Sequence, residues 1–472
     1  MLLADGSSLR VYEAVRVVPN KRIVCKANWH GRSVYAKLFL GRQSQAYAQR
    51  DKRGVDALLK ANVPTPSLLA KTSLVSHAVD VLLFEAIEDS LDAQTLYAQS
   101  SIQQREVLIS RLVATVAKQH EAGLMQTDMY LKNFLVQPST IFSIDGDGIR
   151  QSSHLSNRTA LKNLSAMLSK VDVLELLQCL PSWLEIYANT RGWATPPTCE
   201  KMQAFIQHAR LRAATRFADQ KVFRQCSDVS IKQDGQQFLA IAQAYSVALN
   251  SMNARQLDKA IQDGMLLKDG NTCTVSLATI HQTPVVIKRY NIKNAGHRLS
   301  RMWRASRAAV SWANAHRLQL LGLPTPQPIA LLETRTMGLR GKAYFLSEYI
   351  QAPDLAESFK AITDKVERAK LVKAVVQLCY RLYLLQISHG DFKATNIKVV
   401  AGQPILIDLD SMQQHRWEFF AKRAHVRDLQ RLMQNWKHDT SLYNAFIKSF
   451  KVVYADHTPL QQANILAIND SE

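Results

Sequence analysis

Two aspartate–asparagine pairs in the chain have the residue types and the spacing that phosphate chemistry needs. Asp128 is followed five positions later by Asn133, and Asp391 is followed five positions later by Asn396. Carboxylate and amide oxygens are hard ligands of the kind that Mg²⁺ takes, and a loop aspartate can orient a hydroxyl group and accept its proton. Taken alone, such a pair is more typical of a turn or a helix cap. The pattern therefore needs support from other residues.

One further aspartate follows each pair at the same distance. Asp145 comes twelve positions after Asn133, and Asp408 comes twelve positions after Asn396. Each member of the second set lies 263 positions after its counterpart in the first, an agreement that chance does not explain. We predict Asp128 and Asp391 as catalytic residues, and Asn133, Asp145, Asn396 and Asp408 as metal ligands.

A lysine on a predicted strand in each half would neutralise the phosphates of a nucleotide. Apolar strands are predicted over residues 33–39 and 283–290, with Lys37 and Lys288 near their ends. An ATP triphosphate is too anionic to meet a nucleophile unless Mg²⁺ and cationic side chains screen it. Lys393, two positions after the second catalytic aspartate, could also contact the transferred phosphate. We therefore predict ATP and Mg²⁺ as cofactors, with Lys37, Lys288 and Lys393 as cofactor-binding residues.

The elements that would position these residues also occur twice, in the same order. Each half has a helical stretch after the strand lysine, a turn with two prolines, an apolar strand, a short acidic segment that suits a hinge, and a long amphipathic helix before the catalytic loop. The turns lie at residues 63–66 and 323–326, the apolar strands at 79–84 and 344–349, and the long helices at 103–121 and 364–386.

This duplication predicts two domains in a chain of 472 residues. The stretch from Cys226 to Asn253 is polar at first and then rich in alanine, which favours a junction. We expect a first domain over residues 1–235, a junction over 236–254 and a second domain over 255–472.

An Asp-x4-Asn loop followed by a strand, a turn, a strand and an aspartate is typical of the protein-kinase fold. More specifically, both halves resemble the lipopolysaccharide-kinase group of kinase-like proteins, the heptose and Kdo kinases that act on inner-core sugars. Residues 118–135 are similar to the heptose-kinase catalytic loop, and residues 311–318, 323–326 and 389–391 resemble the same family. The resemblance implies an α+β fold of two tandem protein-kinase-like bilobal domains, each with a β-rich N-lobe and a helical C-lobe. It also implies ATP-dependent phosphorylation of a sugar hydroxyl of the lipopolysaccharide inner core.

Three features depart from the usual kinase pattern. Neither half has a glycine-rich phosphate loop. The helix after each lysine lacks a glutamate to pair with it: Asp51 or Asp56 would be a shorter substitute in the first half, and no acid lies near Asn314 in the second. The second half keeps the His-Gly pair before its aspartate, whereas the first half has Gln126 and Thr127. Since that histidine commonly supports the catalytic loop, the sequence leaves open whether both halves are active.

Four other residues have two interpretations each. Asp147 and Asp410 would add a metal oxygen or cap the turn that follows. Asp428 would anchor the backbone near the catalytic loop or form a surface ion pair. His120 is expected to pack at a helix end and not to act as a base.

The chain is strongly basic, with 59 Lys and Arg residues against 39 Asp and Glu residues and a net charge of +20. Residues 270–332 include eight Lys or Arg and no acid, and four of these arginines recur at every third position: Arg298, Arg301, Arg304 and Arg307. Such a stripe has two interpretations: a face that attracts the phosphates of nucleic acid, lipid headgroups or a phosphorylated glycolipid, or an ordinary solvated helix face. The partners we expect are a lipopolysaccharide core or lipid-linked glycan and an anionic membrane surface. Nucleic acid is not expected as a partner, because aromatic residues do not interleave the basic ones regularly.

The sequence has neither an export signal at its start nor an apolar run of ~18 residues. We therefore expect a cytoplasmic protein that can contact the inner membrane peripherally. Two alternatives remain beside the sugar kinase. The missing glycine loop and glutamate favour a pseudokinase that serves as a binding module or scaffold in envelope assembly, whereas Lys393 supports a protein Ser/Thr kinase.

Overall fold

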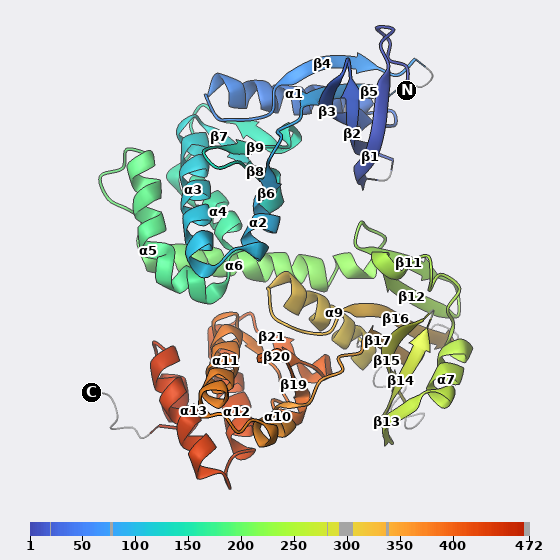
Figure 1. Ribbon diagram of the computed structural model, residues 1–472, viewed down its shortest axis with the longest axis vertical. Coiled ribbons are helices and arrows are strands. Elements are labelled where there is room, and N and C mark those ends of the chain that lie inside the picture. The colour runs from blue at the N-terminus through green and yellow to red at the C-terminus, as the bar shows by residue number, and fades with distance from the viewer. Residues whose placement is uncertain (19, 76–78, 281, 292–304, 337–338, 467–472) are drawn as a thin grey trace. The chain divides into compact units, whose positions relative to one another are not determined.

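The computed structural model describes the chain except for residues 19, 76–78, 281, 292–304, 337–338 and 467–472. It divides into two compact units, Met1–Arg210 and Leu211–Glu472 (Figure 1). Helix α6 (Cys199–Ala218) begins in the first unit and ends in the second. Three of the four arginines of the basic repeat, Arg298, Arg301 and Arg304, lie outside the described residues.

The β-rich lobe of the first unit is an antiparallel five-stranded sheet with the strand order β1-β2-β3-β5-β4. Because side chains alternate between the two faces of a strand, Val34, Ala36 and Leu38 of β3 enter one apolar core while Lys37 points to the other face. Helix α1 packs on that second face through Ala48. The bounds are β1 (Leu9–Val18), β2 (Arg22–Trp29), β3 (Arg32–Phe39), α1 (Ser44–Lys60), β4 (Leu68–Ser73) and β5 (Asp80–Glu85).

The helical lobe of the first unit is built around α3 (Ile102–Glu121), whose side chains Leu108, Leu112 and Val116 recur at every fourth position and are buried. A capping box between Ser101 and Gln104 pairs the backbone N–H groups of these two residues at its start. The other elements are β6 (Leu91–Asp92), α2 (Ala93–Gln99), β7 (Leu124–Gln126), η1 (Leu131–Asn133), β8 (Phe134–Val136), β9 (Ile141–Ser143), η2 (Gly146–Gly148), β10 (Ile149–Gln151), α4 (Asn157–Leu168) and α5 (Val173–Thr190).

The second unit repeats this sheet and extends it. Strands β13-β14-β15-β17-β16 have the order of the first sheet, and β12 and β11 add to the β16 edge. The bounds are η3 (Lys221–Phe223), β11 (Val229–Gln233), β12 (Gln237–Ala242), η4 (Gln243–Tyr245), α7 (Ala254–Asp263), β13 (Met265–Gly270), β14 (Cys273–Ile280), β15 (Thr283–Tyr290), α9 (Arg307–Leu320), β16 (Pro328–Thr336) and β17 (Leu339–Glu348).

The division between the units differs from the boundaries expected from the sequence. Residues 236–254 were expected as a junction, but β12 lies within them and pairs with β16 of the second sheet. Leu239, Ile241 and Leu249 join the apolar core of that sheet. The stretch from Cys226 to Asn253, expected as a junction, therefore contains two strands, β11 and β12, that extend the second sheet. The boundary between the two compact units lies earlier in the chain, after Arg210.

The helical lobe of the second unit follows the plan of the first. Its elements are α10 (Leu355–Ala361), α11 (Lys365–Leu384), β18 (Ile387–Ser388), η5 (Ala394–Asn396), β19 (Ile397–Val400), β20 (Gln403–Leu406), η6 (Leu409–Ser411), β21 (Gln413–Gln414), α12 (Glu418–Gln434), α13 (Thr440–Val453) and α14 (Thr458–Gln462). The expected α+β fold, a β-rich lobe followed by a helical lobe and present twice, is confirmed.

The proline turns join the two lobes within each unit. The Ser143 N–H donates to the Pro64 carbonyl at 2.8 Å, and the Leu406 N–H donates to the Pro324 carbonyl at 3.0 Å. Each bond ties a turn of the β-rich lobe to the hairpin that leads to the predicted metal aspartate. Among the described helices, none combines the length and the apolar character needed to cross a bilayer.

Candidate active sites

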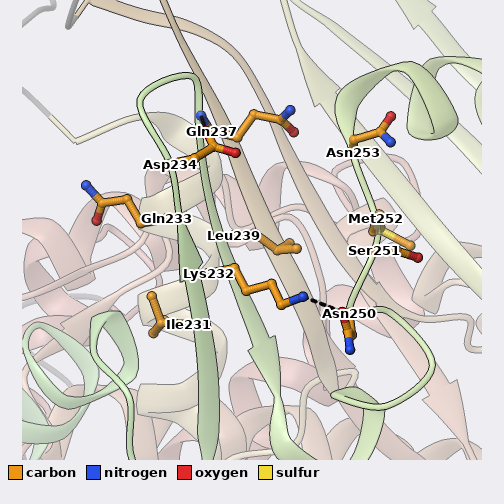
Figure 2. A pocket seen from close by; sticks show the side chains of 10 residues that line it. All are labelled: Ile231, Lys232, Gln233, Asp234, Gln237, Leu239, Asn250, Ser251, Met252 and Asn253. Carbon is orange, nitrogen blue, oxygen red and sulfur yellow. Dashed lines mark hydrogen bonds between the residues drawn. The ribbon is translucent and has the colours of Figure 1, made fainter.

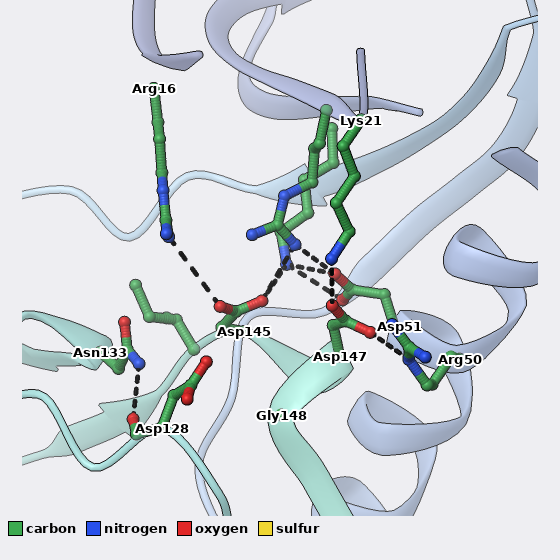
Figure 3. Close-up of polar contacts among 12 residues, drawn as sticks. Arg16, Lys21, Arg50, Asp51, Asp128, Asn133, Asp145, Asp147 and Gly148 are labelled. Atoms are coloured by element: carbon green, nitrogen blue, oxygen red, sulfur yellow. Dashed lines mark hydrogen bonds and ion pairs between the residues drawn. The ribbon is translucent and has the colours of Figure 1, made fainter. Parts of the chain in front are cut away.

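The predicted asparagines hold the catalytic loops in both units. In the first unit, Asn133 Nδ2 donates to the Asp128 carbonyl at 2.8 Å (Figure 3). In the second, Asn396 Nδ2 donates to the Asp391 carbonyl at 2.9 Å and to Asp391 Oδ2 at 3.1 Å. In both, the amide nitrogen fixes the loop, so the amide oxygen remains available as a ligand.

A backbone bond places each asparagine beside the predicted metal aspartate. The Ile144 N–H donates to the Asn133 carbonyl at 2.9 Å, and the Ile407 N–H donates to the Asn396 carbonyl at 3.0 Å. Asp145 and Asp408 follow directly, with left-handed φ angles of 72° and 61°. A side chain other than glycine seldom adopts this conformation, and such strain concentrates at functional sites. The structure therefore brings Asn133 to Asp145 and Asn396 to Asp408, as the spacing predicted.

The lysine of the first unit pairs with the helix that follows it. Lys37 Nζ lies 2.8 Å and 3.0 Å from the two carboxylate oxygens of Asp51, which is fully buried on α1. Of the two substitutes considered, Asp51 is the partner, because Asp56 pairs with Lys52 on the surface. Burial raises the pKa of Asp51, and the charge of Lys37 opposes that rise. Lys37 also lies 3.9 Å from Asp145, so the strand lysine reaches the predicted metal ligand.

The lysine of the second unit obtains its carboxylates from the other lobe. Lys288 Nζ donates to Asp408, and to Asp410 at 2.7 Å. Asn314, which lies 263 positions after Asp51, instead donates to the Leu409 and Met412 carbonyls at 2.9 Å and 2.8 Å. The helix acid that the second unit lacks is thus replaced by Asp410, two positions after the predicted metal ligand Asp408.

Asp410 is held by more donors than Lys288. Tyr290 Oη donates to it at 3.0 Å, and Arg307 forms an ion pair with it at 2.9 Å. Burial would raise the pKa of Asp410, but Lys288 and Arg307 outweigh burial and lower it. Arg307, the one described member of the basic repeat, therefore pairs with a carboxylate of the site. The structure gives Asp410 the role of a partner for cations, an interpretation that the sequence had not offered.

A buried arginine in the first site was missed by sequence reasoning. Arg22 is 6% exposed, and its Nη1 lies 3.0 Å from Asp145 and 3.4 Å from Asp51. Burial opposes its charge, but Asp145 outweighs burial and raises the pKa of Arg22. Val24 pairs with Lys37 across the sheet, so Arg22, two positions away, shares the face of Lys37. The position of Arg22, two residues before the cross-strand partner of Lys37, was the feature of the sequence that could have predicted its place in the site.

Further cations surround the first site. Arg16 lies 4.0 Å from Asp145, Lys21 lies 3.7 Å from Asp147, and Arg50 donates to Asp147 (Figure 3). In the second sheet, the position that corresponds to Arg22 in strand register is Cys273, a buried thiol whose pKa is raised by burial. Among the described residues, the first site therefore has a buried arginine at a position where the second has a cysteine.

The side chain that precedes each predicted catalytic aspartate by two positions is a different residue type in the two units, but it makes the same hydrogen bond. His389 Nε2 shares a hydrogen bond with the Ile407 carbonyl at 2.9 Å, and Gln126 Nε2 donates to the Ile144 carbonyl at 3.0 Å. Both partners of the bond in the second unit lie 263 positions after the partners of the bond in the first, so the two bonds are equivalent in the repeat. Gln126 therefore supports the first loop in the way that His389 supports the second.

Asp428 anchors the backbone of the second loop. It is 5% exposed and accepts hydrogen bonds from the His389 N–H at 2.6 Å and the Gly390 N–H at 3.0 Å. Burial raises its pKa to about 6, against the effect of these two donors. Of the two interpretations of Asp428, the backbone anchor is therefore confirmed, and the surface ion pair is wrong. In the first unit, Asn163 lies on the corresponding helix α4 and donates to the Gln126 carbonyl at 2.8 Å.

Two cations face Asp391, the predicted catalytic aspartate of the second unit. Lys393 Nζ lies 3.0 Å from Asp391 Oδ2, and Arg431 Nε lies 3.5 Å from Asp391 Oδ1. Burial would raise the pKa of Asp391, but Lys393 and then Asn396 and Arg431 outweigh it and lower that pKa. The carboxylate is therefore ionised at neutral pH. Asp128 of the first unit is exposed, and Tyr130 stands at the position of Lys393.

Two other features of the units are a buried histidine and a pocket. His120 is buried, with Nδ1 2.8 Å from Tyr187 Oη and Nε2 3.0 Å from Asn163 Oδ1, and burial lowers its pKa to about 4. The expectation of a packed histidine is confirmed. A pocket of about 570 Å³ opens between β11, β12 and residues 250–253 of the second unit, where Lys232 donates to Asn250 (Figure 2). It includes none of the predicted site residues.

The chain was compared with models of protein families, with curated proteins and with solved structures. The model of the lipopolysaccharide kinase (Kdo/WaaP) family matches residues 27–181 and 267–454, a segment in each unit. No curated protein matches the chain. Among solved structures, the chain is similar to vaccinia related kinase 3, with 12% sequence identity and a TM-score of 0.29 over 44% of this chain and 82% of that one. Since the family model covers most of the chain, in two segments with the same constellation, this protein belongs to the lipopolysaccharide kinase (Kdo/WaaP) family and is a kinase-like phosphotransferase with two tandem copies of the fold.

Proposed function

We propose that the protein transfers the γ-phosphoryl group of ATP to a hydroxyl of a lipopolysaccharide inner-core sugar. One observation carries the proposal: in each unit the strand lysine of the β-rich lobe reaches the aspartate that lies twelve positions after the loop asparagine. Lys37 lies 3.9 Å from Asp145, and Lys288 is hydrogen-bonded to Asp408. Residues more than 100 positions apart thus converge on one place in both units.

The side chains around each convergence point suit phosphoryl transfer. Lys37 and Lys288 present an ammonium group to the nucleotide phosphates. Asp128 and Asp391 accept the proton of the attacking hydroxyl and orient its oxygen. In the second unit, Lys393 lies 3.0 Å from Asp391, where it can neutralise charge on the phosphoryl group in transit. Protein groups that are already positioned in this way need little reorganisation when the substrates bind.

The residues at both sites also fit Mg²⁺. The donor set is a carboxylate and an amide oxygen in each unit, Asp145 with Asn133 and Asp408 with Asn396, and these are ligands that Mg²⁺ prefers. The ion, when bound, would screen the charge of the triphosphate. Because the ammonium groups of Lys37 and Lys288 already lie close to these carboxylates, the same residues can hold the metal and the phosphates side by side.

The acceptor is proposed from family membership and charge. The net charge of +20 favours an anionic partner, and a phosphorylated core sugar of a lipopolysaccharide or lipid-linked glycan combines hydroxyl groups with negative charge. A neutral sugar would gain nothing from this charge. We place the reaction at the cytoplasmic side of the inner membrane.

A second candidate function applies to the first unit alone. Arg22 lies 3.0 Å from Asp145, so in the first unit a buried guanidinium contacts the predicted metal ligand in addition to the strand lysine, Lys37, at 3.9 Å. This favours a first unit that binds nucleotide without turnover and acts as a binding module for the second. The equivalent position in the second unit is Cys273, which brings no charge to Asp408.

The test is ATP consumption by the full chain with core oligosaccharide as acceptor, for Asp128→Asn, Asp391→Asn and the double variant. Loss of a proton-accepting carboxylate should lower the rate by about 10²–10⁴-fold in a unit that turns over. Asp56→Asn and Asp263→Asn, at exposed positions of the two units, are the controls. Rates equal to the parent in all three variants would refute the assigned roles. A loss with Asp391→Asn alone would assign the first unit as the binding module.

Binding is measured separately from turnover. ATP with Mg²⁺ should raise the melting temperature of the chain, and removal of Mg²⁺ by EDTA should abolish that shift. Lys288→Met should reduce the shift contributed by the second unit. A chain that shows no shift under any of these conditions would be a scaffold and not a kinase.

A further inference from the structure

Three large aromatic side chains are exposed together at the start of α12 in the second unit. Trp417, Phe419 and Phe420 are 64%, 62% and 56% exposed. Trp417 is the N-cap residue of the helix, and the two phenylalanines lie in its first turn. Large apolar side chains normally gain free energy by leaving water, so a cluster of this kind marks a contact surface.

Arginines share the exposed face of this helix. Arg423, Arg427 and Arg431 are exposed and recur at every fourth position, which places them in one line along an α-helix. Arg416 precedes the helix, and its guanidinium lies 5.6 Å from the Trp417 ring centroid. Arg423 lies at the same distance from the Phe419 ring. The aromatic cluster and the line of arginines therefore form one continuous surface, residues 416–431, named here the α12 face.

The opposite side of α12 is packed into the unit. Ala421, Ala424, Leu429 and Leu432 are buried there. The segment from Arg416 to Gln434 is fully described and has two acids: Asp428 is buried, and Glu418 pairs with Lys422 at 2.8 Å. No acid of this segment therefore neutralises the exposed arginines.

We propose that the α12 face docks on an anionic lipid bilayer. A bilayer surface presents phosphate groups next to an apolar layer, and the α12 face presents guanidinium groups next to aromatic rings. Tryptophan and phenylalanine rings partition into the membrane interface, while basic residues beside them bind anionic headgroups. Charge complementarity thus selects this partner. A purely apolar protein surface would offer no anion to Arg416, Arg423 and Arg427, and a purely anionic one would leave three aromatic side chains in water.

The same helix connects the α12 face to the catalytic loop. Asp428 anchors His389 and Gly390, and Arg431 Nε lies 3.5 Å from Asp391. From Phe419 to Arg431 the helix rises by roughly 18 Å, at about 1.5 Å per residue. Docking through the aromatic end would hold Asp391 close to the headgroups, where a lipid-linked sugar would present its hydroxyl. Bilayer binding itself needs neither ATP nor the catalytic residues, so it stands or falls independently of the proposed function.

Cosedimentation of the full chain with vesicles tests this proposal. The parent should bind phosphatidylcholine vesicles that contain phosphatidylglycerol, should bind pure phosphatidylcholine at least about tenfold more weakly, and should lose affinity as salt rises, because exposed charges are screened. The triple variant Trp417→Ser/Phe419→Ser/Phe420→Ser and the double variant Arg416→Gln/Arg423→Gln should each lose binding about tenfold or more.

Matched controls separate the α12 face from general stickiness. Tyr12→Ser/Val247→Ser removes exposed apolar side chains elsewhere, and Arg53→Gln/Arg158→Gln removes two exposed arginines of the first unit. Both controls should bind like the parent. Binding by the triple variant at the level of the parent, or an equal loss in the controls, would overturn the proposal. An unchanged melting temperature, measured without ligand, shows that each variant is folded.

Tryptophan fluorescence gives a second readout that needs no disruptive variant. Among the tryptophans that the structure describes, Trp417 is the exposed one. Anionic vesicles should therefore protect the emission of the parent from iodide quenching, and the protection should be lost in Trp417→Phe. Protection that persists in Trp417→Phe, or that is absent from the parent, would place the bilayer contact elsewhere.

Discussion

Lys288 Nζ lies 2.7 Å from Asp410 Oδ2, and this carboxylate comes from the helical lobe, two positions after the predicted metal aspartate. In the first unit, Lys37 Nζ lies 2.8 Å from Asp51, which comes from the helix after the lysine strand. The two copies of one fold therefore hold the same lysine with carboxylates from different lobes. Asn314, at the position of Asp51, has become a donor to the backbone of the turn that carries Asp410.

We predict that Asp410→Asn impairs the second unit specifically. Loss of a charged hydrogen-bond partner costs about 1.5–3 kcal/mol, which corresponds to about a tenfold or larger fall in kcat/KM for ATP. The rate is measured in a chain whose first unit carries Asp128→Asn, so that the second unit alone contributes. In that background Asp51→Asn is the matched control and should leave the rate unchanged. An equal fall with both substitutions would show that Asp410 does not act through Lys288.

The correspondence between Gln126 and His389 predicts a tolerated exchange. His389→Gln should keep the hydrogen bond to the Ile407 carbonyl, and the rate should fall less than about threefold. His389→Ala leaves that carbonyl without its side-chain donor, which should cost about 1–3 kcal/mol of stability in the loop. Hydrogen exchange of peptides around Asp391 measures the loss. If His389→Gln loosened the loop as much as His389→Ala, the imidazole would have a role that an amide cannot fill.

The backbone of Gly54 lies so close to the backbone of Gly146 that the first unit has no room for a side chain at Gly54. A Cβ atom at Gly54 on α1 would lie 2.0 Å from the Gly146 carbonyl oxygen, next to Asp145. Gly54→Ala should therefore push α1 away from this turn, weaken the contact of Asp51 with Lys37, and cost about 1–3 kcal/mol. Gly148→Ala is the control, because its Cβ would meet its nearest neighbour at an ordinary 3.6 Å. Equal thermal stability of the two variants would contradict this packing.

The buried carboxylate of Asp428 predicts a pH dependence. Its pKa rises from 3.8 to about 6 on folding, so the folded chain retains a proton that the unfolded chain loses. Its stabilising contribution is therefore complete below about pH 4 and is lost as pH rises to about 6, a change of roughly 3 kcal/mol. Hydrogen exchange of peptides from α12 and the catalytic loop measures the opening free energy. Asp428→Asn should flatten this pH profile, and an unchanged profile would assign it to another group.

The repeated spacing was enough to predict much of both sites. An asparagine five positions after an aspartate and twelve before another lies at the start of one hairpin, because the intervening length fits two short strands and a turn. Asn133 with Asp145 and Asn396 with Asp408 are accordingly brought together by local bonds. The strand of Lys37 and the long helix before Asp128 followed from side-chain periodicity. Those features depend on neighbours along the chain, which a sequence displays directly.

Other features depended on contacts between distant residues. Two candidates for the partner of Lys37 lay five positions apart on one helix, and only the packing of α1 placed Asp51 inside and Asp56 in water. The sequence of β12 was interpreted as part of a junction, and only its pairing with β16 identifies it as a strand of the second sheet. Arg22 reaches Asp145 across 123 positions, and its role depends on which face of β2 is turned toward the helical lobe.

The order of lysine, aspartate, asparagine and aspartate, which occurs once in each half of the chain, was enough to indicate the family and the reaction class of this protein. Tertiary structure alone decided which carboxylate holds each lysine, which cations crowd the first site, and which face of α12 remains in water. The reason is physical: spacing constrains groups that are linked by a short stretch of backbone, whereas the charge and burial of a side chain depend on elements that fold against it from elsewhere in the sequence.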